Sequence, residues 1–187
     1  MGSAKEWLPF GDETMLQRIL RVVAETVGPL IVVGAAGQRL PELPATVQVV
    51  HDRRPDRGPM EGLAAGLVAL PAGVEAAFVT TVDAPLLTAP FVRRMFTLFA
   101  ATSPEIEIVA PRIDGRVYPL TAVYRRSALP RIEQFLAADR LRVTDLLAAA
   151  PTRFLAADEL RDIDPELISL RNVNTPAEYQ AALRSVR

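Results

Sequence analysis

The sequence predicts an α/β fold in three layers: a mixed, mostly parallel β-sheet with helices on both faces. Two observations predict it. Helical and strand-like patterns alternate along the first half of the chain in the order helix, strand, strand, helix, strand, helix, as in folds built from parallel strands and crossover helices. A short apolar run at 76–82, bounded by turn-forming residues, is typical of a strand that is buried on both faces.

Composition narrows the class of protein. The chain has 187 residues, half of them apolar, so we expect a single domain over residues 1–187 with a sizeable core. The formal net charge of −1 gives no electrostatic case for binding nucleic acid or an anionic membrane. No apolar run approaches the ~20 residues of a membrane span. The absence of cysteine excludes disulfides and is compatible with the cytoplasmic location that we expect.

The first half of the chain is divided by turn and capping residues. Asp12 is a suitable N-cap for a helix with apolar residues at helical spacing, and Gly28-Pro29 would end that helix. Pro59 suits the first position of the next helix, and Thr88 is a suitable N-cap for a third. The expected helices are 12–27, one from 59 onward, and 88–101; the expected strands are 30–33, 46–50 and 76–82.

The second half begins with a hairpin signal and ends with a helix signal. Asp114-Gly115 between two apolar runs predicts a tight β-hairpin, which makes the sheet mixed. Thr175-Pro176 predicts a helix with Thr175 as the N-cap and proline at the first position. The expected strands are 106–110, 119–124, 152–155 and 168–173; the expected helices are 127–138, 142–149 and 176–186.

Two carboxylates follow expected strands directly. Asp83 ends the run at 76–82, and Asp52 follows the strand at 46–50. Ligands of open α/β sheets bind at the carboxyl ends of the strands, so either side chain could face a ligand. Asp83 could hold a divalent metal against a phosphate. The alternative for each residue is an ordinary turn cap, for Asp83 the turn before Pro85.

Several short motifs occur in a fixed order over nearly the whole chain. They are Met1-Gly-Ser-Ala-Lys5 with Leu8-Pro-Phe-Gly11; Asp52 followed by Gly58-Pro-Met-Glu-Gly62-Leu-Ala-Ala-Gly-Leu67; Val82-Asp83-Ala-Pro85; Asp114-Gly-Arg116 with Pro119-Leu120; and Arg171-Asn-Val-Asn-Thr-Pro-Ala-Glu178. Together they resemble the molybdenum cofactor guanylyltransferases, members of the nucleotide-diphospho-sugar transferase-like superfamily. The Gly-Pro-x-x-Gly block and the Asn-Val-Asn-Thr-Pro segment carry most of the specificity.

The resemblance implies a Rossmann-like fold and a Mg²⁺-dependent transfer of GMP from GTP to molybdopterin, with release of pyrophosphate. It also implies transient contacts with a molybdopterin-loading protein and with acceptor molybdoenzymes. The family opens with a strand and a Leu-Ala-Gly-Gly-x-Ser-x-Arg-Met-Gly loop before a lysine. This chain begins at the Met-Gly of that motif. The expectation is therefore that the first strand, central to the sheet, and most of the phosphate-binding loop are missing, through a late start or a truncation.

The resemblance also implies roles for residues around the nucleotide. Lys5 would place a positive charge on the phosphates, where the alternative is a solvated surface lysine. Asp83 would bind Mg²⁺, and Asp52 would orient the nucleotide or assist the metal. Gly58 and Gly62 would let the backbone approach the ligand closely, or would serve only for close packing of helix on sheet.

Further residues are implied on the substrate side. Asn174 and Asn172 could hydrogen-bond the pterin, although Asn174 also belongs to an ordinary helix start. Arg116, on the hairpin, could reach an anionic substrate or simply face solvent. His51, the only histidine, has no partner for a metal site and is expected to have no catalytic role.

One departure leaves the base specificity open. Family members often have an asparagine that contacts guanine near Gly34-Ala35-Ala36, and this chain has none there. A cytidylyltransferase or a sugar-phosphate nucleotidyltransferase of the same fold therefore stays an alternative. A catalytically impaired binding module, without the phosphate loop, is the alternative outside enzymes.

Overall fold

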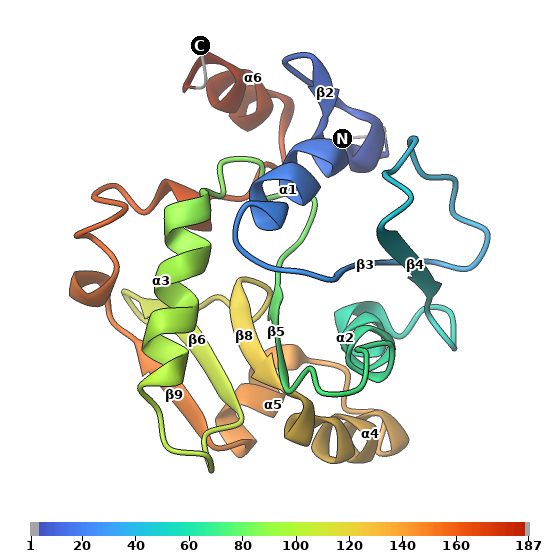
Figure 1. Ribbon diagram of the computed structural model, residues 1–187, viewed down its shortest axis with the longest axis vertical. Coiled ribbons are helices and arrows are strands. Elements are labelled where there is room, and N and C mark those ends of the chain that lie inside the picture. The colour runs from blue at the N-terminus through green and yellow to red at the C-terminus, as the bar shows by residue number, and fades with distance from the viewer. Residues whose placement is uncertain (1–3, 186–187) are drawn as a thin grey trace.

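The computed structural model describes residues 4–185, and its elements form a mixed α/β structure (Figure 1). Met1, Gly2 and Ser3 of the first motif lie outside the described residues. The helices are α1 (Met15–Ala24), α2 (Gly58–Val68), α3 (Ala89–Ala100), α4 (Leu129–Ala137), α5 (Val143–Ala149) and α6 (Pro176–Ser185). The strands are β1 (Pro9–Phe10), β2 (Glu13–Thr14), β3 (Leu30–Gly34), β4 (Val47–His51), β5 (Ala76–Val79), β6 (Ile108–Ile113), β7 (Arg116–Val117), β8 (Ala122–Arg125) and β9 (Thr152–Leu155).

The larger sheet has the strand order β5-β8-β6-β7, with β9 paired to β6. The strand β8 is antiparallel to both β5 and β6, so β5 and β6 run in the same direction, and β9 is parallel to β6. The strands β3 and β4 form a separate parallel pair, and β1 and β2 a short hairpin. The expected mixture of parallel and antiparallel strands is confirmed, but no described strand joins β3 to β5.

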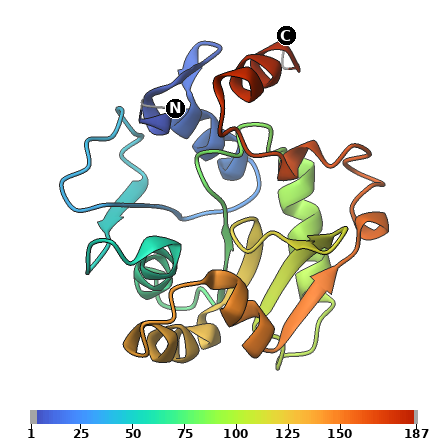
Figure 2. The same cartoon turned by 180° about the vertical axis from the view of Figure 1, so that it is seen from behind.

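Alternating side chains of the larger sheet are buried on opposite faces, because successive residues of a strand point to opposite sides. Val109 and Val123 pack in one core with α1 and α3, whereas Ile108 and Tyr124 pack in a second core with α2, α4 and α5. All four side chains are fully buried. Helices therefore cover both faces, and the two opposite views show α3 on one side and α5 on the other (Figures 1 and 2).

Most expected elements are confirmed, and the cap of α3 is as expected. The Thr88 hydroxyl accepts a hydrogen bond from the Phe91 N–H at 3.4 Å. Asp114 and Gly115 both adopt positive φ in the β6–β7 hairpin, as a tight turn requires. The N-cap of α6 is Thr175, whose hydroxyl accepts from the Glu178 N–H at 3.2 Å. Within residues 4–185, no helix is long and apolar enough to cross a membrane.

Two expectations were wrong and two strands are shorter than expected. Asp12 lies in the β1–β2 turn; the cap of α1 is Thr14, which forms a reciprocal capping box with Gln17. Residues 168–173 are not a strand, because the buried Asp164 carboxylate accepts from the Ile168 N–H at 2.9 Å and closes a 3-10 turn there. The strand β5 ends at Val79, where its pairing with β8 ends, and β8 begins at Ala122 rather than at residue 119.

The capping box of α1 gives a stability prediction. Thr14→Ala removes the side-chain acceptor of the Gln17 N–H, so we expect a loss of about 1 kcal/mol in the free energy of unfolding by urea. Thr97→Ala is the control, because the Thr97 hydroxyl only donates to the Arg93 carbonyl on the exposed surface of α3. That control should stay within about 0.5 kcal/mol of wild type. Equal losses in the two variants would contradict a specific role of the cap.

Candidate active site

Three segments that are far apart in the sequence meet beyond the carboxyl end of β5. The Lys5 ammonium donates to Asn174 Oδ1 at 2.7 Å and to Asp83 Oδ2 at 3.4 Å. These partners are 169 and 78 residues from Lys5 in the sequence. The Lys5 and Asp83 side chains are half-buried, at 26% and 21% exposure. Lys5 is also the only lysine in the chain.

Local hydrogen bonds fix the position of the Asp83 carboxylate. The Thr81 hydroxyl donates to Asp83 Oδ1, leaving Oδ2 to face Lys5. The Ala84 N–H donates to the Thr81 carbonyl at 3.2 Å and closes the turn that ends β5. Thr81 was not predicted as a site residue; the available signal was a hydroxyl two residues before the carboxylate, a spacing common in turns.

Main-chain contacts also hold Asn174 against this turn. The Val173 N–H donates to the Asp83 carbonyl at 2.7 Å, so the segment before α6 is tied to the loop after β5. The Glu178 carboxylate accepts from the Asn174 and Thr175 N–H groups, both at 2.8 Å. These hydrogen bonds to the charged form lower the pKa of Glu178. The Asn174 side chain is therefore free to bind Lys5, while its main chain serves the helix start.

Asp52 lies at the carboxyl end of β4, beside α2. Its N–H donates to the Gly34 carbonyl at 3.0 Å, and its side chain makes no hydrogen bond among residues 4–185. Burial raises the pKa of Asp52, and the nearby Glu61 carboxylate raises it further. Glu61 is itself buried, at 2% exposure, and is paired with Arg53 at 2.9 Å. Among residues 4–185, the Asp52 carboxylate thus has no hydrogen-bond partner, and it lies at the carboxyl end of β4.

The backbone requires glycine at one of the two glycines beside Asp52. Gly58 has φ +62° at the start of α2, a conformation that favours glycine. A Cβ on Gly62 would lie 3.5 Å from Asp52 Oδ1 and 3.7 Å from Val33, in ordinary contact. Packing of α2 on β3 therefore leaves room for a Cβ at Gly62, whereas the positive φ of Gly58 favours glycine.

The remaining candidates do not join the Lys5 cluster. The exposed Arg116 side chain stacks over Tyr118, with its guanidinium carbon 4.9 Å from the ring centre. Asn172 makes none of the side-chain hydrogen bonds found among residues 4–185. His51 Nδ1 lies 3.2 Å from the Ala35 carbonyl oxygen, as suits a structural residue at the strand end.

The side chain of Gln38 fixes the segment that follows β3. Gln38 Oε1 accepts from the Ala35 N–H at 2.9 Å, and Gln38 Nε2 donates to Glu6 at 2.7 Å. A Cβ on Gly34 would approach Gln38 Oε1 to 2.9 Å, so the end of the Gln38 side chain would have to shift to accommodate it. The main chain at Ala35 is therefore engaged internally, and Gln38 is a polar side chain at this edge that the sequence analysis did not single out.

The lysine and the carboxylate lie at the carboxyl end of a strand of an α/β sheet, which is where proteins of this class bind their ligands. The sequence model described as "MobA-like NTP transferase domain" matches residues 1–153, and the chain belongs to this family.

A relative from Mycobacterium tuberculosis, named probable molybdenum cofactor guanylyltransferase, is 33% identical over 190 residues, which cover 100% of this chain and 89% of the relative. The chain is similar in structure to the molybdopterin-guanine dinucleotide biosynthesis protein A of Archaeoglobus fulgidus, with a TM-score of 0.79 and 18% identity, over 99% and 91% of the two chains.

Two further solved structures share the fold. One is the 2-C-methyl-D-erythritol 4-phosphate cytidylyltransferase of Thermus thermophilus, with a TM-score of 0.73 and 16% identity, over 100% of this chain and 95% of that chain. The other is a Mycobacterium tuberculosis protein in complex with manganese, with a TM-score of 0.64 and 20% identity, over 98% and 93% of the two chains. The expected nucleotide-diphospho-sugar transferase-like fold is confirmed.

The raised pKa of Asp52 gives a prediction for stability against pH. Folding disfavours the ionised form of a group whose pKa is raised, so wild type carries a cost at neutral pH that Asp52→Asn lacks. We expect Asp52→Asn to unfold at a higher urea concentration than wild type at pH 7. The difference should shrink as the pH falls through the raised pKa of Asp52 and vanish well below the unfolded pKa of about 3.9, where Asp52 is protonated in both states.

The control for this experiment is Asp158→Asn, which changes an exposed carboxylate outside the site. Its stability difference from wild type should show no such rise between pH 4 and pH 7. A destabilised Asp52→Asn at pH 7 would contradict the assignment of Asp52 as an unpartnered, partly buried carboxylate.

Proposed function

We propose that this protein transfers GMP from GTP to molybdopterin with release of pyrophosphate. The observation that carries the proposal is the meeting of Lys5, Asp83 and Asn174 at one edge of the sheet. A cation for phosphates, a carboxylate for a metal and an amide for a second substrate are the groups that such a transfer needs. Membership of the NTP transferase family supports the reaction class, and the name of the mycobacterial relative supports guanylyl transfer.

The proposed step is a displacement at phosphorus. A terminal phosphate oxygen of molybdopterin attacks the α-phosphorus of GTP and forms a new P–O bond. The bond from the α-phosphorus to the bridging oxygen of the β-phosphate breaks, and its electron pair leaves with pyrophosphate. The protein contributes mainly by positioning the reactants and by stabilising charge on the phosphate oxygens. Lys5 would turn its ammonium group from Asp83 toward these oxygens, since it offers rotatable donors on a flexible stem.

Asp83 fits the role of a Mg²⁺ ligand. Mg²⁺ in nucleotide enzymes is commonly bound through one or two carboxylates together with substrate phosphates. Among residues 4–185 no three His, Cys, Asp or Glu side chains gather into an all-protein metal site, so phosphate oxygens and water would supply the other ligands. The bound ion would neutralise charge on the phosphates. Thr81 would keep the Asp83 carboxylate oriented, and Asp52 would orient the nucleotide or assist the metal.

Asn174, Asn172 and Arg116 would bind the second substrate. Asn174 would exchange its hydrogen bond to Lys5 for one to the pterin, with Asn172 beside it. Arg116 would leave Tyr118 to reach an anionic group. The proposal includes a cytoplasmic location and transient contacts with a molybdopterin-loading protein and acceptor molybdoenzymes, as the family resemblance implies.

The first functional prediction concerns the two charged residues. Asp83→Asn should abolish the Mg²⁺ dependence of GTP binding, and Lys5→Met should weaken GTP binding whether or not Mg²⁺ is present. Each change should lower the rate of GMP transfer by about 100-fold or more, because it removes a charge that faces the phosphates. Calorimetry with and without Mg²⁺ measures the binding, and pyrophosphate release measures the reaction.

The control is Asp158→Asn, whose carboxylate is exposed and lies outside the cluster. It should bind GTP and release pyrophosphate as wild type does. Nucleotide binding that survives unchanged in both Asp83→Asn and Lys5→Met would contradict the assignment. Folded wild type that binds no nucleotide would favour the binding module.

The second prediction concerns the base. The alternative of cytidylyl transfer is supported by the Thermus cytidylyltransferase, which has the same fold. If the guanylyl assignment holds, GTP should bind at least about tenfold more tightly than CTP in the presence of Mg²⁺, a difference of about 1.4 kcal/mol. Gln38→Ala should reduce this preference, because Gln38 organises the Ala35 segment where a base would lie. A preference for CTP would transfer the assignment to the cytidylyl alternative.

A further inference from the structure

The three segments that meet at the candidate site share a small apolar core behind it. Each segment contributes one buried side chain: Phe10 from β1, Leu86 from the loop after β5, and Val173 from the segment before α6. The helix α1 adds Met15, which is fully buried. We call this core the junction. Because the junction packs all three segments together, a contact beside it can fix their relative positions.

Arg18 of α1 is a charged side chain beside the junction. Its Nε donates to the Pro85 carbonyl at 2.7 Å, two residues after Asp83. Its guanidinium carbon lies 5.1 Å from the centre of the Phe10 ring, and its side chain is 16% exposed. One mostly buried group therefore contacts both the loop that carries Asp83 and the strand that follows Lys5.

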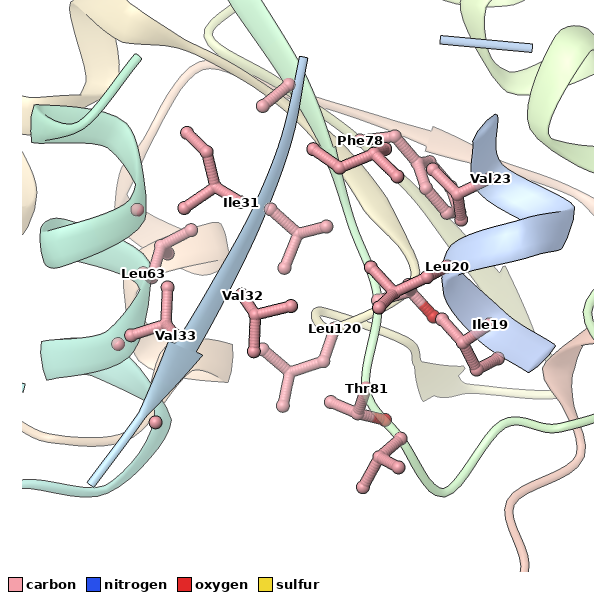
Figure 3. A pocket seen from close by; sticks show the side chains of 18 of the residues that line it. Ile19, Leu20, Val23, Ile31, Val32, Val33, Leu63, Phe78, Thr81 and Leu120 are labelled. Atoms are coloured by element: carbon pink, nitrogen blue, oxygen red, sulfur yellow. The ribbon is translucent and has the colours of Figure 1, made fainter. Parts of the chain in front are cut away.

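Apolar side chains of α1 pack beside the same loop. Ile19 and Leu20 are buried, and together with Thr81 they line an apolar cavity (Figure 3). Arg18, the residue before them, adds a polar contact between the helix and this loop. The apolar packing should hold α1 in place when the contact of Arg18 is removed.

The charge of Arg18 is incompletely balanced by its surroundings. Burial lowers the pKa of Arg18, and the charge of Arg21 lowers it further, by more than Glu13 and Glu25 raise it. Glu13 lies 3.8 Å from the Arg18 guanidinium and 2.8 Å from that of Arg21, so it serves mainly Arg21. A buried charge of this kind is weak evidence for stabilisation of the fold. The guanidinium therefore has a better explanation in the groups that it holds in place.

We infer that Arg18 is a positioning residue for the transfer reaction: it sets the place of the Asp83 loop relative to the segment that carries Lys5. The inference rests on the proposed function of the site. The guanidinium is planar and rigid, so its hydrogen bond and its stacking on Phe10 are fixed together. Mg²⁺ requires near-ideal ligand geometry, and groups that orient a metal ligand typically change metal affinity by about 10-fold to 100-fold. A small displacement of the loop should therefore weaken the binding of metal more than the binding of nucleotide.

The first test needs neither nucleotide nor metal. Arg18→Met keeps an unbranched apolar stem but removes the hydrogen bond to Pro85 and the stacking on Phe10. The Val173 N–H, which donates to the Asp83 carbonyl at 2.7 Å, reports the position of the loop. Its hydrogen exchange, measured by NMR, should become roughly fivefold faster, the effect of one lost hydrogen bond.

The second test separates positioning from folding. In Arg18→Met, the Mg²⁺ concentration that gives half-maximal pyrophosphate release should rise about tenfold. Binding of GTP without Mg²⁺ should stay within about twofold of wild type, because Lys5 is unchanged. A purely structural role of Arg18 would lower the folded fraction and leave this Mg²⁺ concentration as it is in wild type.

The matched control is Arg21→Met, which makes the same replacement on the same helix. The Arg21 side chain is 52% exposed and, among residues 4–185, forms ion pairs only with Glu13 and Glu25. This variant should leave both the exchange at Val173 and the dependence on Mg²⁺ as they are in wild type.

Phe10→Leu tests the same contact from the other side. It removes the ring on which Arg18 stacks, so it should also raise the Mg²⁺ concentration for half-maximal release. The double variant should differ from Arg18→Met by less than about twofold, because the two changes break one contact. Circular dichroism establishes that each variant is folded, and Phe10→Leu keeps the test decisive if Arg18→Met does not fold.

Several outcomes would overturn the inference. One is unchanged exchange at Val173 or unchanged dependence on Mg²⁺ in Arg18→Met; another is an equal change in Arg21→Met. Full recovery in Arg18→Lys would also overturn it, because lysine restores the charge without the planar group. Failure of the proposed function looks different, because wild type would then transfer no GMP. An active wild type beside an Arg18→Met variant with normal Mg²⁺ dependence would overturn only the role of Arg18.

Discussion

Burial of the larger sheet on both faces is the constraint on which the other features depend. The strands β6 and β8 send alternate side chains into two separate cores, so a shift of one residue in register would place each set of side chains in the core packed around the other set. The strand β8 is antiparallel to both of its neighbours, and β5 therefore runs parallel to β6. The carboxyl end of β5 then faces the edge where Asp83 meets Lys5.

Main-chain hydrogen bonds position the segments that carry the site residues. The hydrogen bond of 2.7 Å from the Val173 N–H to the Asp83 carbonyl brings the segment before α6 to the end of β5. Asn174 follows directly, and Lys5 lies between the two side chains. A lysine with a carboxylate and an amide for partners has its charge balanced while no phosphate is present, and it can exchange these contacts for phosphate oxygens.

The sequence allowed prediction of those features that depend on short segments. The Thr88 and Thr175 caps and the Asp114-Gly115 turn depend on residues at most a few positions apart. Thr14-x-x-Gln17 has the same local character and could have been preferred to Asp12 as a cap. Residues 168–173 have a strand-like composition, but the buried carboxylate of Asp164 gives their N–H groups a better partner. Local pattern cannot reveal that competition.

The site was predictable only in part, because it depends on contacts between segments that are far apart in the sequence. Strand ends located Asp83 and Asp52, and the family resemblance added Lys5 and Asn174. The contact between Lys5 and Asn174 spans 169 residues and depends on the completed fold. Lys5 is the only lysine in the chain, and this has a chemical consequence. Acylation of a lysine side chain in this protein can therefore occur only at Lys5. It would remove the positive charge that lies between Asp83 and Asn174.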